Sequence, residues 1–325
     1  MKIDLVTPKD PDDRSGNAVT VNRWAGHLRA LGHDVEVVRG WAPETGRDAD
    51  LLVALHARRS ADAALAWRAE RPGAPLVVAL TGTDLYRDLE EHEEARRAVR
   101  AADLLVALQE RASAGLPARL RDRLRVIHQS AVPPDPRPEP REDVFEAALL
   151  CHMRPVKDPF LAARAVRLLP EDSSVRVIHA GRALSEEARR RAEREDGSSP
   201  RYRWVGELGR EEALRLLARA RTLIVTSRLE GGANVVTEAL ACGTPVLASR
   251  IDGNVGLLGA GYPGYFPVGD APALARLLRR AETDPDFLAT LRAEVGERSE
   301  LADPARERGA WASLLDELTP ATGRR

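Results

Sequence analysis

Two glutamates, Glu230 and Glu238, stand eight residues apart around a pair of glycines and form the most specific chemical pattern in the chain. The run TLIVT at 222–226 is apolar and β-branched, which predicts a buried strand. The run NVVTEALAC at 234–242 has helical composition and is followed by Gly243 and Pro245, which predicts a helix that ends there. Glu230 and the two glycines are therefore expected on a strand-to-helix loop.

This loop has the features of a binding site for a diphosphate flanked by two sugars. Glycine lets the backbone come close to a ligand, and the free N–H groups of a helix's first turn favour an anion. A carboxylate only accepts hydrogen bonds, so it pairs better with vicinal sugar hydroxyls than with phosphate. Eight residues at about 1.5 Å rise span roughly 12 Å at most, which suits a nucleotide-sugar. The predicted donor contacts in this segment are Glu230, Gly231, Gly232, Ala233, Asn234, Val235 and Glu238. The plainer alternative is a helix cap with a surface carboxylate.

The segment around 228–249 resembles the E-x7-E signature of family 4 glycosyltransferases, which have the GT-B fold. The resemblance implies that Glu230 meets the transferred sugar and that Glu238 meets the ribose of the nucleotide.

Composition is that of a globular protein. The 325 residues are 43% hydrophobic and 30% charged, with a net charge of −1, so no overall field favours nucleic acid or an acidic membrane. No apolar run approaches ~18 residues, and the chain enters a strand-like segment at once, so neither a membrane helix nor a signal peptide is expected. We expect a cytoplasmic protein without membrane or nucleic-acid partners. Cys151 and Cys242 lack metal-ligand spacing and are predicted core residues.

Alternating strand-like and helix-like segments predict an α/β protein with parallel sheets. Five prolines at 132–140 interrupt the alternation and predict a stiff linker, after which the pattern restarts. We predict two Rossmann-like domains facing across a cleft. The acceptor-side domain covers 1–140 with the linker, and the nucleotide-sugar domain covers 141–300. Residues 301–325 are predicted to form a C-terminal helix, which in GT-B enzymes crosses back to the first domain; alternatively, it caps its own domain.

Further donor contacts are expected where predicted strands end, because α/β sheets bind ligands beyond the carboxyl ends of their strands. Arg154 and Lys157 follow the strand-like LLCHM and precede a helix, so they would meet the oxygens of a diphosphate and stabilise the departing nucleotide. Gly16 and Asn17 open the first helix, although Gly-Asn is also an ordinary turn. Gly181, Val205 and Gly206 resemble the family's loops near the sugar and the uracil. Because two cations occupy the diphosphate position, no metal and no cofactor are expected.

Two segments of the first half carry the predicted acceptor site. ALHARRS and LTGTDLYRD each follow a predicted strand and gather basic side chains, which indicates an anionic acceptor; solvent-facing arginines are the alternative. The predicted acceptor contacts are His56, Arg58, Arg59, Thr81, Gly82, Thr83 and Arg87.

Several strings, among them LTGTDLYRDL, HMRPVKDP and GLLGAGYPGYF, are similar to the SenB-type selenosugar synthases of selenoneine biosynthesis, a branch of the family 4-like transferases. The resemblance implies that selenophosphate attacks UDP-GlcNAc or UDP-Glc, that UDP leaves, and that Se–P hydrolysis gives a selenosugar. It implies catalytic roles for Arg154, Lys157 and Glu230. For the hydrolysis, which needs a water and a base, His56, Asp84 and Asp88 are the candidates, and the sequence does not choose between them.

Two alternatives remain from the residues themselves. The first is a family 4 UDP-sugar transferase with a hydroxyl or amine acceptor, which would share the whole donor half. The second is a nucleotide-sugar binding protein without turnover. A dinucleotide oxidoreductase is disfavoured because no G-x-G-x-x-G follows a predicted strand.

Overall fold

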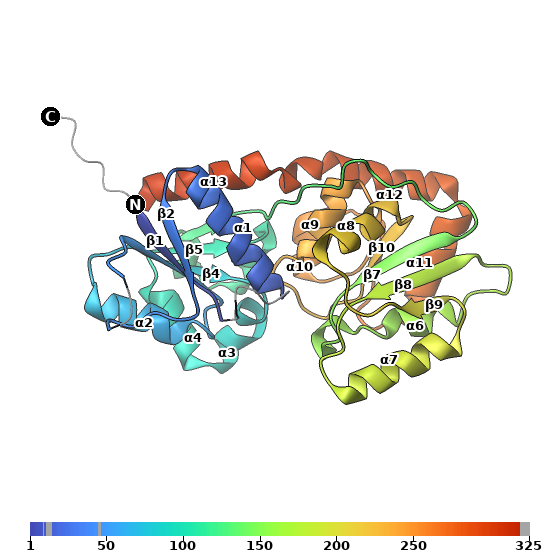
Figure 1. Cartoon of the computed structure of the whole chain (residues 1–325), viewed down its shortest axis with the longest axis horizontal. Helices are drawn as coiled ribbons and strands as arrows, with labels where there is room; N and C mark the ends of the chain where they lie inside the picture. Colours follow the sequence, from blue (N-terminus) through green and yellow to red (C-terminus); the bar gives the residue numbers. More distant parts are fainter. Residues whose placement is uncertain (9, 11–14, 45–46, 319–325) are drawn as a thin grey trace. The chain divides into compact units, whose positions relative to one another are not determined.

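The computed structural model describes residues 1–8, 10, 15–44 and 47–318, and the chain forms two compact units (Figure 1). Unit 1 contains Met1–Gln129, Glu230–Asn234 and the chain from Pro304 onwards. Unit 2 contains Ser130–Leu229 and Val235–Asp303. The predicted donor loop is therefore part of unit 1, although it lies inside the sequence of unit 2. Residues 319–325 of the predicted C-terminal helix lie outside the described residues.

Unit 1 is built on a six-stranded parallel sheet with the strand order β2-β1-β3-β4-β5-β6. Its strands are β1 (Lys2–Val6), β2 (Asp34–Val38), β3 (Leu51–Leu55), β4 (Leu76–Leu80), β5 (Leu104–Ala107) and β6 (Leu124–Val126). The chain leaves β1 toward β2 and returns on the other side to β3, so the order reverses between β1 and β3. Such a reversal is where open α/β sheets bind ligands.

Alternate residues of each strand point to opposite sides of this sheet, and each side packs into its own hydrophobic core. Ile3, Leu5 and Val53 face a core shared with α1 (Gly16–Ala30) and α13 (Pro304–Leu318). The rings of Trp24 in α1 and Trp311 in α13 pack edge to face, with 4.9 Å between their centroids. Figure 1 shows the two helices side by side. Leu52 and Val78 are among the strand residues that face the opposite core, with α2 (Ala61–Glu70) and α4 (Glu93–Ala101).

Short elements fill the connections of unit 1. They are the π-helical turn η1 (Asp84–Asp88), α3 (Leu89–Glu91), the 3-10 turn η2 (Glu110–Gly115) and α5 (Ala118–Arg121).

Unit 2 has a second six-stranded parallel sheet, with the order β12-β11-β10-β7-β8-β9. Its strands are β7 (Phe145–Leu150), β8 (Val175–Ala180), β9 (Tyr202–Trp204), β10 (Thr222–Val225), β11 (Val246–Ser249) and β12 (Tyr265–Phe266). The chain runs outward from β7 to β9, then resumes on the other side of β7 with β10. The reversal between β7 and β10 gives this sheet its own switch point.

The helices of unit 2 connect these strands and extend the unit beyond the last one. They are α6 (Leu161–Val166), α7 (Glu186–Ser198), α8 (Arg210–Arg219), α9 (Asn234–Cys242), α10 (Asp252–Leu258), α11 (Ala271–Thr283) and α12 (Pro285–Glu297), with the turns η3 (Pro155–Lys157) and η4 (Ser299–Ala302). Aspartates cap two of them: the side chain of Asp270 accepts a hydrogen bond from the Ala273 N–H, and that of Asp284 accepts one from the Phe287 N–H.

The predicted α/β class with two parallel-sheet units is confirmed. The proline-rich stretch at 132–140 contains neither helix nor strand. No helix within the described ranges has the length and apolar character needed to cross a bilayer.

Candidate functional site

In unit 2, the loop after β7 and the loop after β10 are hydrogen-bonded to each other at the switch point. The Thr226 hydroxyl donates to the Lys157 carbonyl at 2.7 Å, and the Arg228 N–H donates to the Val156 carbonyl at 2.8 Å. The loop that carries the predicted cations thus has a fixed position relative to the strand end that leads to Glu230.

The turn between Arg154 and Lys157 is held by Asp158. The backbone of Asp158 has a φ of 40°, in the left-handed region that Asp tolerates better than most residues. Its largely buried carboxylate pairs with Arg228 at 2.9 Å and with Arg164 at 3.4 Å. Arg154 and Lys157 are themselves partly buried, at the two ends of the turn η3. The backbone N–H of Lys157 donates to the Arg154 carbonyl at 2.9 Å, so both cationic residues lie on one turn at the switch point, where they could neutralise a diphosphate.

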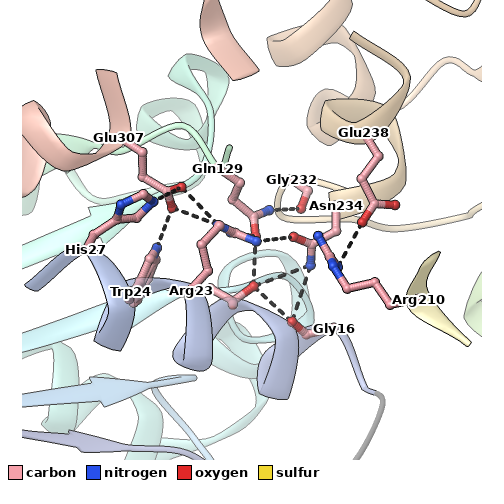
Figure 2. A network of polar contacts seen from close by, with 11 residues as sticks. Gly16, Arg23, Trp24, His27, Gln129, Arg210, Gly232, Asn234, Glu238 and Glu307 are labelled. Carbon is pink, nitrogen blue, oxygen red and sulfur yellow. Dashed lines mark hydrogen bonds and ion pairs between the residues drawn. The ribbon is translucent and has the colours of Figure 1, made fainter. Parts of the chain in front are cut away.

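Glu238 lies in α9, and its carboxylate accepts a hydrogen bond from Arg210 at 3.2 Å (Figure 2). The Glu238 side chain is 16% exposed and that of Arg210 is 49% exposed, so the pair lies at the surface of unit 2. Glu230 is partly buried in unit 1. A sugar hydroxyl that bound Glu238 would share its carboxylate with Arg210 or displace that guanidinium.

Gly181 and Gly206 join the ends of β8 and β9. The Gly181 N–H donates to the Gly206 carbonyl at 2.7 Å, and a Cβ at Gly181 would lie 1.8 Å from the Cys151 carbonyl oxygen. Gly206 has a φ of 75°, and the adjacent Val205 is 41% exposed. The close approach at Gly181 is therefore to the neighbouring strand end, while Val205 presents an apolar side chain to solvent.

The donor loop Glu230–Asn234 packs closely on the strand ends of unit 1. A Cβ at Gly231 would lie 2.5 Å from the Gly82 nitrogen, and a Cβ at Gly232 would lie 2.5 Å from the Leu108 Cβ. Both glycines are buried. Because both residues lack a side chain, the loop can contact the turns after β4 and β5. The sequence pattern indicated close approach to a ligand and gave no sign of this packing role.

The start of α1 lies against the same loop. Ser15 caps the helix by accepting a hydrogen bond from the Ala18 N–H at 3.4 Å. Gly16 is exposed, its carbonyl accepts from the Asn234 amide at 3.3 Å, and Asn17 follows it as a partly buried residue. Gly16, Asn17 and Asn234 thus lie in one region of unit 1.

His56 is the central polar residue of the predicted acceptor segments. It is 3% exposed and has a φ of 74°, a strained conformation that is frequent at functional sites. Its Nδ1 faces the Arg59 N–H at 3.4 Å, which assigns the ring proton to Nε2, 3.0 Å from the Thr83 hydroxyl. Burial lowers the pKa of His56, against the opposing effect of nearby Asp84 and Asp88, so the ring is neutral near pH 7.

Asp84 is fully buried and organises the two segments. Its carboxylate accepts three backbone N–H groups, from Ala57 at 3.0 Å, Thr81 at 3.1 Å and Gly82 at 2.7 Å. These hydrogen bonds tie the loop after β3 to the loop after β4. The geometry is that of a carboxylate that fixes backbone, although the sequence also suggested it as a base.

The arginines of these segments differ in their partners. Arg87 pairs with the buried Asp88 at 3.2 Å, and Arg58 lies 3.9 Å from Asp88 and 3.6 Å from Glu94. Arg59 is exposed and makes no ion pair with any residue that the structure describes. It is thus the acceptor-side guanidinium with the greatest freedom to bind an incoming anion.

Asp88 also belongs to a group of possible metal ligands. One ligand atom each of Asp88, Glu91 and His92 lies within 4.8 Å of the others. Asp88 is at the same time engaged by Arg87, so an ion there would compete with a guanidinium.

Sequence reasoning missed three residues: Arg23 and Gln129, which contact the donor loop, and Glu307, which binds Arg23 (Figure 2). They come from α1, from the segment after β6 and from α13, and no local motif links them. Their common signal is that each is polar yet mostly buried, which only the fold reveals.

Residues 137–301, about half of the chain, match the family model described as glycosyl transferases group 1. Among solved structures, Anabaena HepE in complex with UDP and glucose is 18% identical, covers 98% of this chain and 100% of its own, and has a TM-score of 0.76. Sucrose-phosphate synthase from Thermosynechococcus elongatus is 18% identical, with 98% of each chain covered and a TM-score of 0.78. No curated protein sequence matches the chain.

The chain belongs to the group 1 glycosyl transferases, and it has their GT-B fold. The predicted fold class and the prediction of a glycosyltransferase are confirmed.

Proposed function

We propose that the protein transfers a sugar from a UDP-sugar to selenophosphate. The donor half is supported by the family and by neighbours whose solved complexes hold UDP, or UDP-glucose in the case of Anabaena HepE. The observation that carries it is the hydrogen-bonded pair of loops at the unit 2 switch point, with Arg154 and Lys157 on one loop and the chain to Glu230 on the other. UDP-GlcNAc and UDP-Glc are the proposed donors.

In the proposed reaction, selenium donates a lone pair to the anomeric carbon while the bond from that carbon to the UDP oxygen breaks. UDP leaves with the electron pair, and Arg154 and Lys157 stabilise its added charge. Water then attacks phosphorus, the Se–P bond breaks, and the products are phosphate and the selenosugar. Selenium in selenophosphate is already a strong nucleophile, so the first step needs positioning more than a base.

The acceptor half is supported by the cluster around His56. Arg59 offers a guanidinium that has no ion-pair partner among the described residues, beside a buried, neutral imidazole, and Arg58 and Arg87 contribute further positive charge. We propose that Arg59 binds the selenophosphate oxygens, with Thr81, Gly82 and Thr83 lining the same site. For the hydrolytic step we favour His56 over Asp84, because the hydrogen bond that His56 Nδ1 accepts from the Arg59 N–H is long, at 3.4 Å, whereas both oxygens of Asp84 accept shorter hydrogen bonds from backbone N–H groups, at 2.7 to 3.1 Å.

A second candidate function has its own supporting observation. A neutral His56 could accept a proton from a hydroxyl nucleophile, which a generic UDP-sugar transferase would require. The two functions differ in the acceptor and share the donor.

The test is incubation of the purified protein with UDP-GlcNAc or UDP-Glc and either selenophosphate or hydroxyl acceptors. We expect UDP release and a selenosugar, detected by mass spectrometry, only with selenophosphate. Turnover with hydroxyl acceptors alone would overturn the acceptor assignment and favour the generic transferase. UDP-sugar binding without UDP release under any acceptor would show a binding protein.

Arg59→Ala is the decisive variant for the acceptor half. Because it removes a charged hydrogen-bond donor, we expect the KM for selenophosphate to rise about tenfold while the donor KM stays within about twofold. Arg97→Ala, at another exposed arginine of unit 1, is the matched control and should change neither value. An unchanged KM for selenophosphate in Arg59→Ala would contradict the proposed contact.

A further inference from the structure

We infer that Arg23 is a positioning residue that connects the C-terminal helix α13 to the donor loop, with Glu307 as its anchor. The inference rests on the proposed donor site, because it assigns a role to residues that hold that loop without being expected to touch the nucleotide-sugar.

The side chain of Arg23 uses three N–H groups on three separate segments of unit 1 (Figure 2). Nε donates to Glu307 at 2.9 Å, Nη1 donates to the Asn234 side-chain oxygen at 3.1 Å, and Nη2 donates to the Gln129 side-chain oxygen at 2.7 Å. The side chain is 13% exposed. Only the planar, fixed fork of a guanidinium can satisfy three acceptors in this way.

Glu307 fixes the orientation of this guanidinium. Its carboxylate is fully buried and accepts hydrogen bonds from Arg23, from the Trp24 indole at 2.8 Å and from His27 at 3.1 Å. Trp24 and His27 lie on α1 with Arg23, so the carboxylate of α13 is surrounded by donors from one helix. Glu307 also lies in the first turn of α13, where the helix dipole favours a negative charge.

The network reaches the donor loop at two points. The Gln129 amide accepts from Arg23 and from Thr20 through its oxygen, and donates through its nitrogen to the Gly232 carbonyl at 2.8 Å. Asn234 accepts from Arg23 and donates to the Gly16 carbonyl and to the Thr20 hydroxyl, each at 3.3 Å. Arg23 is thus connected to both ends of the segment 232–234, directly to Asn234 and through Gln129 to Gly232, and the N–H groups of this segment are predicted to face the diphosphate.

The test compares two glutamates of α13. Glu307→Gln keeps the shape of the side chain but places an amide N–H₂ group among hydrogen-bond donors and leaves Arg23 without its counter-ion. Glu317→Gln is the matched control, because Glu317 pairs with Arg125 of unit 1 at 2.8 Å and has no contact with the network. UDP is the probe, and isothermal titration calorimetry gives its Kd on protein whose folding is checked by circular dichroism.

We expect Glu307→Gln to weaken UDP binding about tenfold and Glu317→Gln to change it less than twofold. Arg23→Lys, which keeps the charge but cannot span three acceptors, should weaken UDP binding similarly, and it serves as the test if Glu307→Gln does not fold. In steady state, the donor KM should rise while kcat at saturating donor stays within about threefold. A UDP Kd within twofold of wild type in a folded Glu307→Gln or Arg23→Lys protein would overturn the inference.

A double-mutant cycle separates positioning from general stability. Because Arg23 acts on the loop partly through Asn234 and partly through Gln129, Glu307→Gln combined with Asn234→Ala should weaken UDP binding by less than the sum of the two single free-energy effects. Fully additive effects would contradict the proposed connection. A wild-type protein that does not bind UDP would refute the donor site and this inference together. Binding of UDP without use of selenophosphate would refute only the acceptor half of the proposed function.

Discussion

Gly231→Ala provides a strict test of how the donor loop is held. Gly231 is buried, and a Cβ there would lie 2.5 Å from both the Gly82 nitrogen and the Thr81 carbonyl carbon. Both are backbone atoms of the turn after β4, so no side chain can rotate away. The φ of Gly231 lies outside the left-handed region, which means that the cost of alanine is steric and not conformational.

The magnitude follows from these distances. Ordinary contact begins at 3.4 Å, so the loop or the turn must move by about 0.9 Å to admit the methyl group. Overpacking of this kind typically costs about 1–3 kcal/mol of stability. A displacement of about 1 Å at groups that position a substrate can reduce the rate about 100-fold. We therefore expect kcat/KM for the UDP-sugar to fall by one to two orders of magnitude, by about 10- to 100-fold.

The assay is UDP release at varied donor concentration, combined with urea unfolding. Gly26→Ala in α1 is the control, because a Cβ at Gly26 meets no atom within 4 Å. This substitution should stabilise the helix by up to about 1 kcal/mol and leave activity unchanged. A Gly231→Ala enzyme whose kcat/KM stays within about threefold of wild type would refute the argument, since the loop would then tolerate the displacement.

Two further predictions concern stability. Burial lowers the pKa of His179 to about 4, below its ordinary value of 6.5, so the unfolded chain binds the proton first as pH falls. The free energy of unfolding is therefore highest, as far as His179 is concerned, above pH 6.5. It falls by about 3 kcal/mol in total as the pH drops from 6.5 toward 4. Urea unfolding at several pH values should give a correspondingly flatter profile for His179→Gln, and an unchanged profile would refute this assignment. In α13, Trp311 is fully buried, and its indole N–H has no hydrogen-bond partner among the described residues. Trp311→Ala should therefore cost about 3–5 kcal/mol and Trp311→Phe less than about 1.5 kcal/mol; equal losses in thermal or urea unfolding would show that packing is not what Trp311 contributes.

Local sequence determined the elements and the class of the protein. Apolar runs such as those at β3 and β4 are buried on both faces of their sheet, and their alternation with helices led to the correct α/β class. Hydrophobic periodicity and β-branched composition act within a few residues, so they can be read from the chain without its fold. The spacing of Glu230 and Glu238 around a strand-to-helix loop is local as well, and its resemblance to the family 4 signature led to a glycosyltransferase of the GT-B fold.

Only the tertiary structure decided how the site is held together. Gly231 and Gly232 fit a site for a phosphate in the sequence, but in the fold they pack against turns more than 100 residues earlier in the chain. Asp84 fits a base, but it accepts three backbone N–H groups. Arg23 gives no signal, because its partners lie 106, 211 and 284 residues away. Sequence patterns record local periodicity and composition, whereas hydrogen bonds and steric contacts between distant segments exist only once the chain has folded.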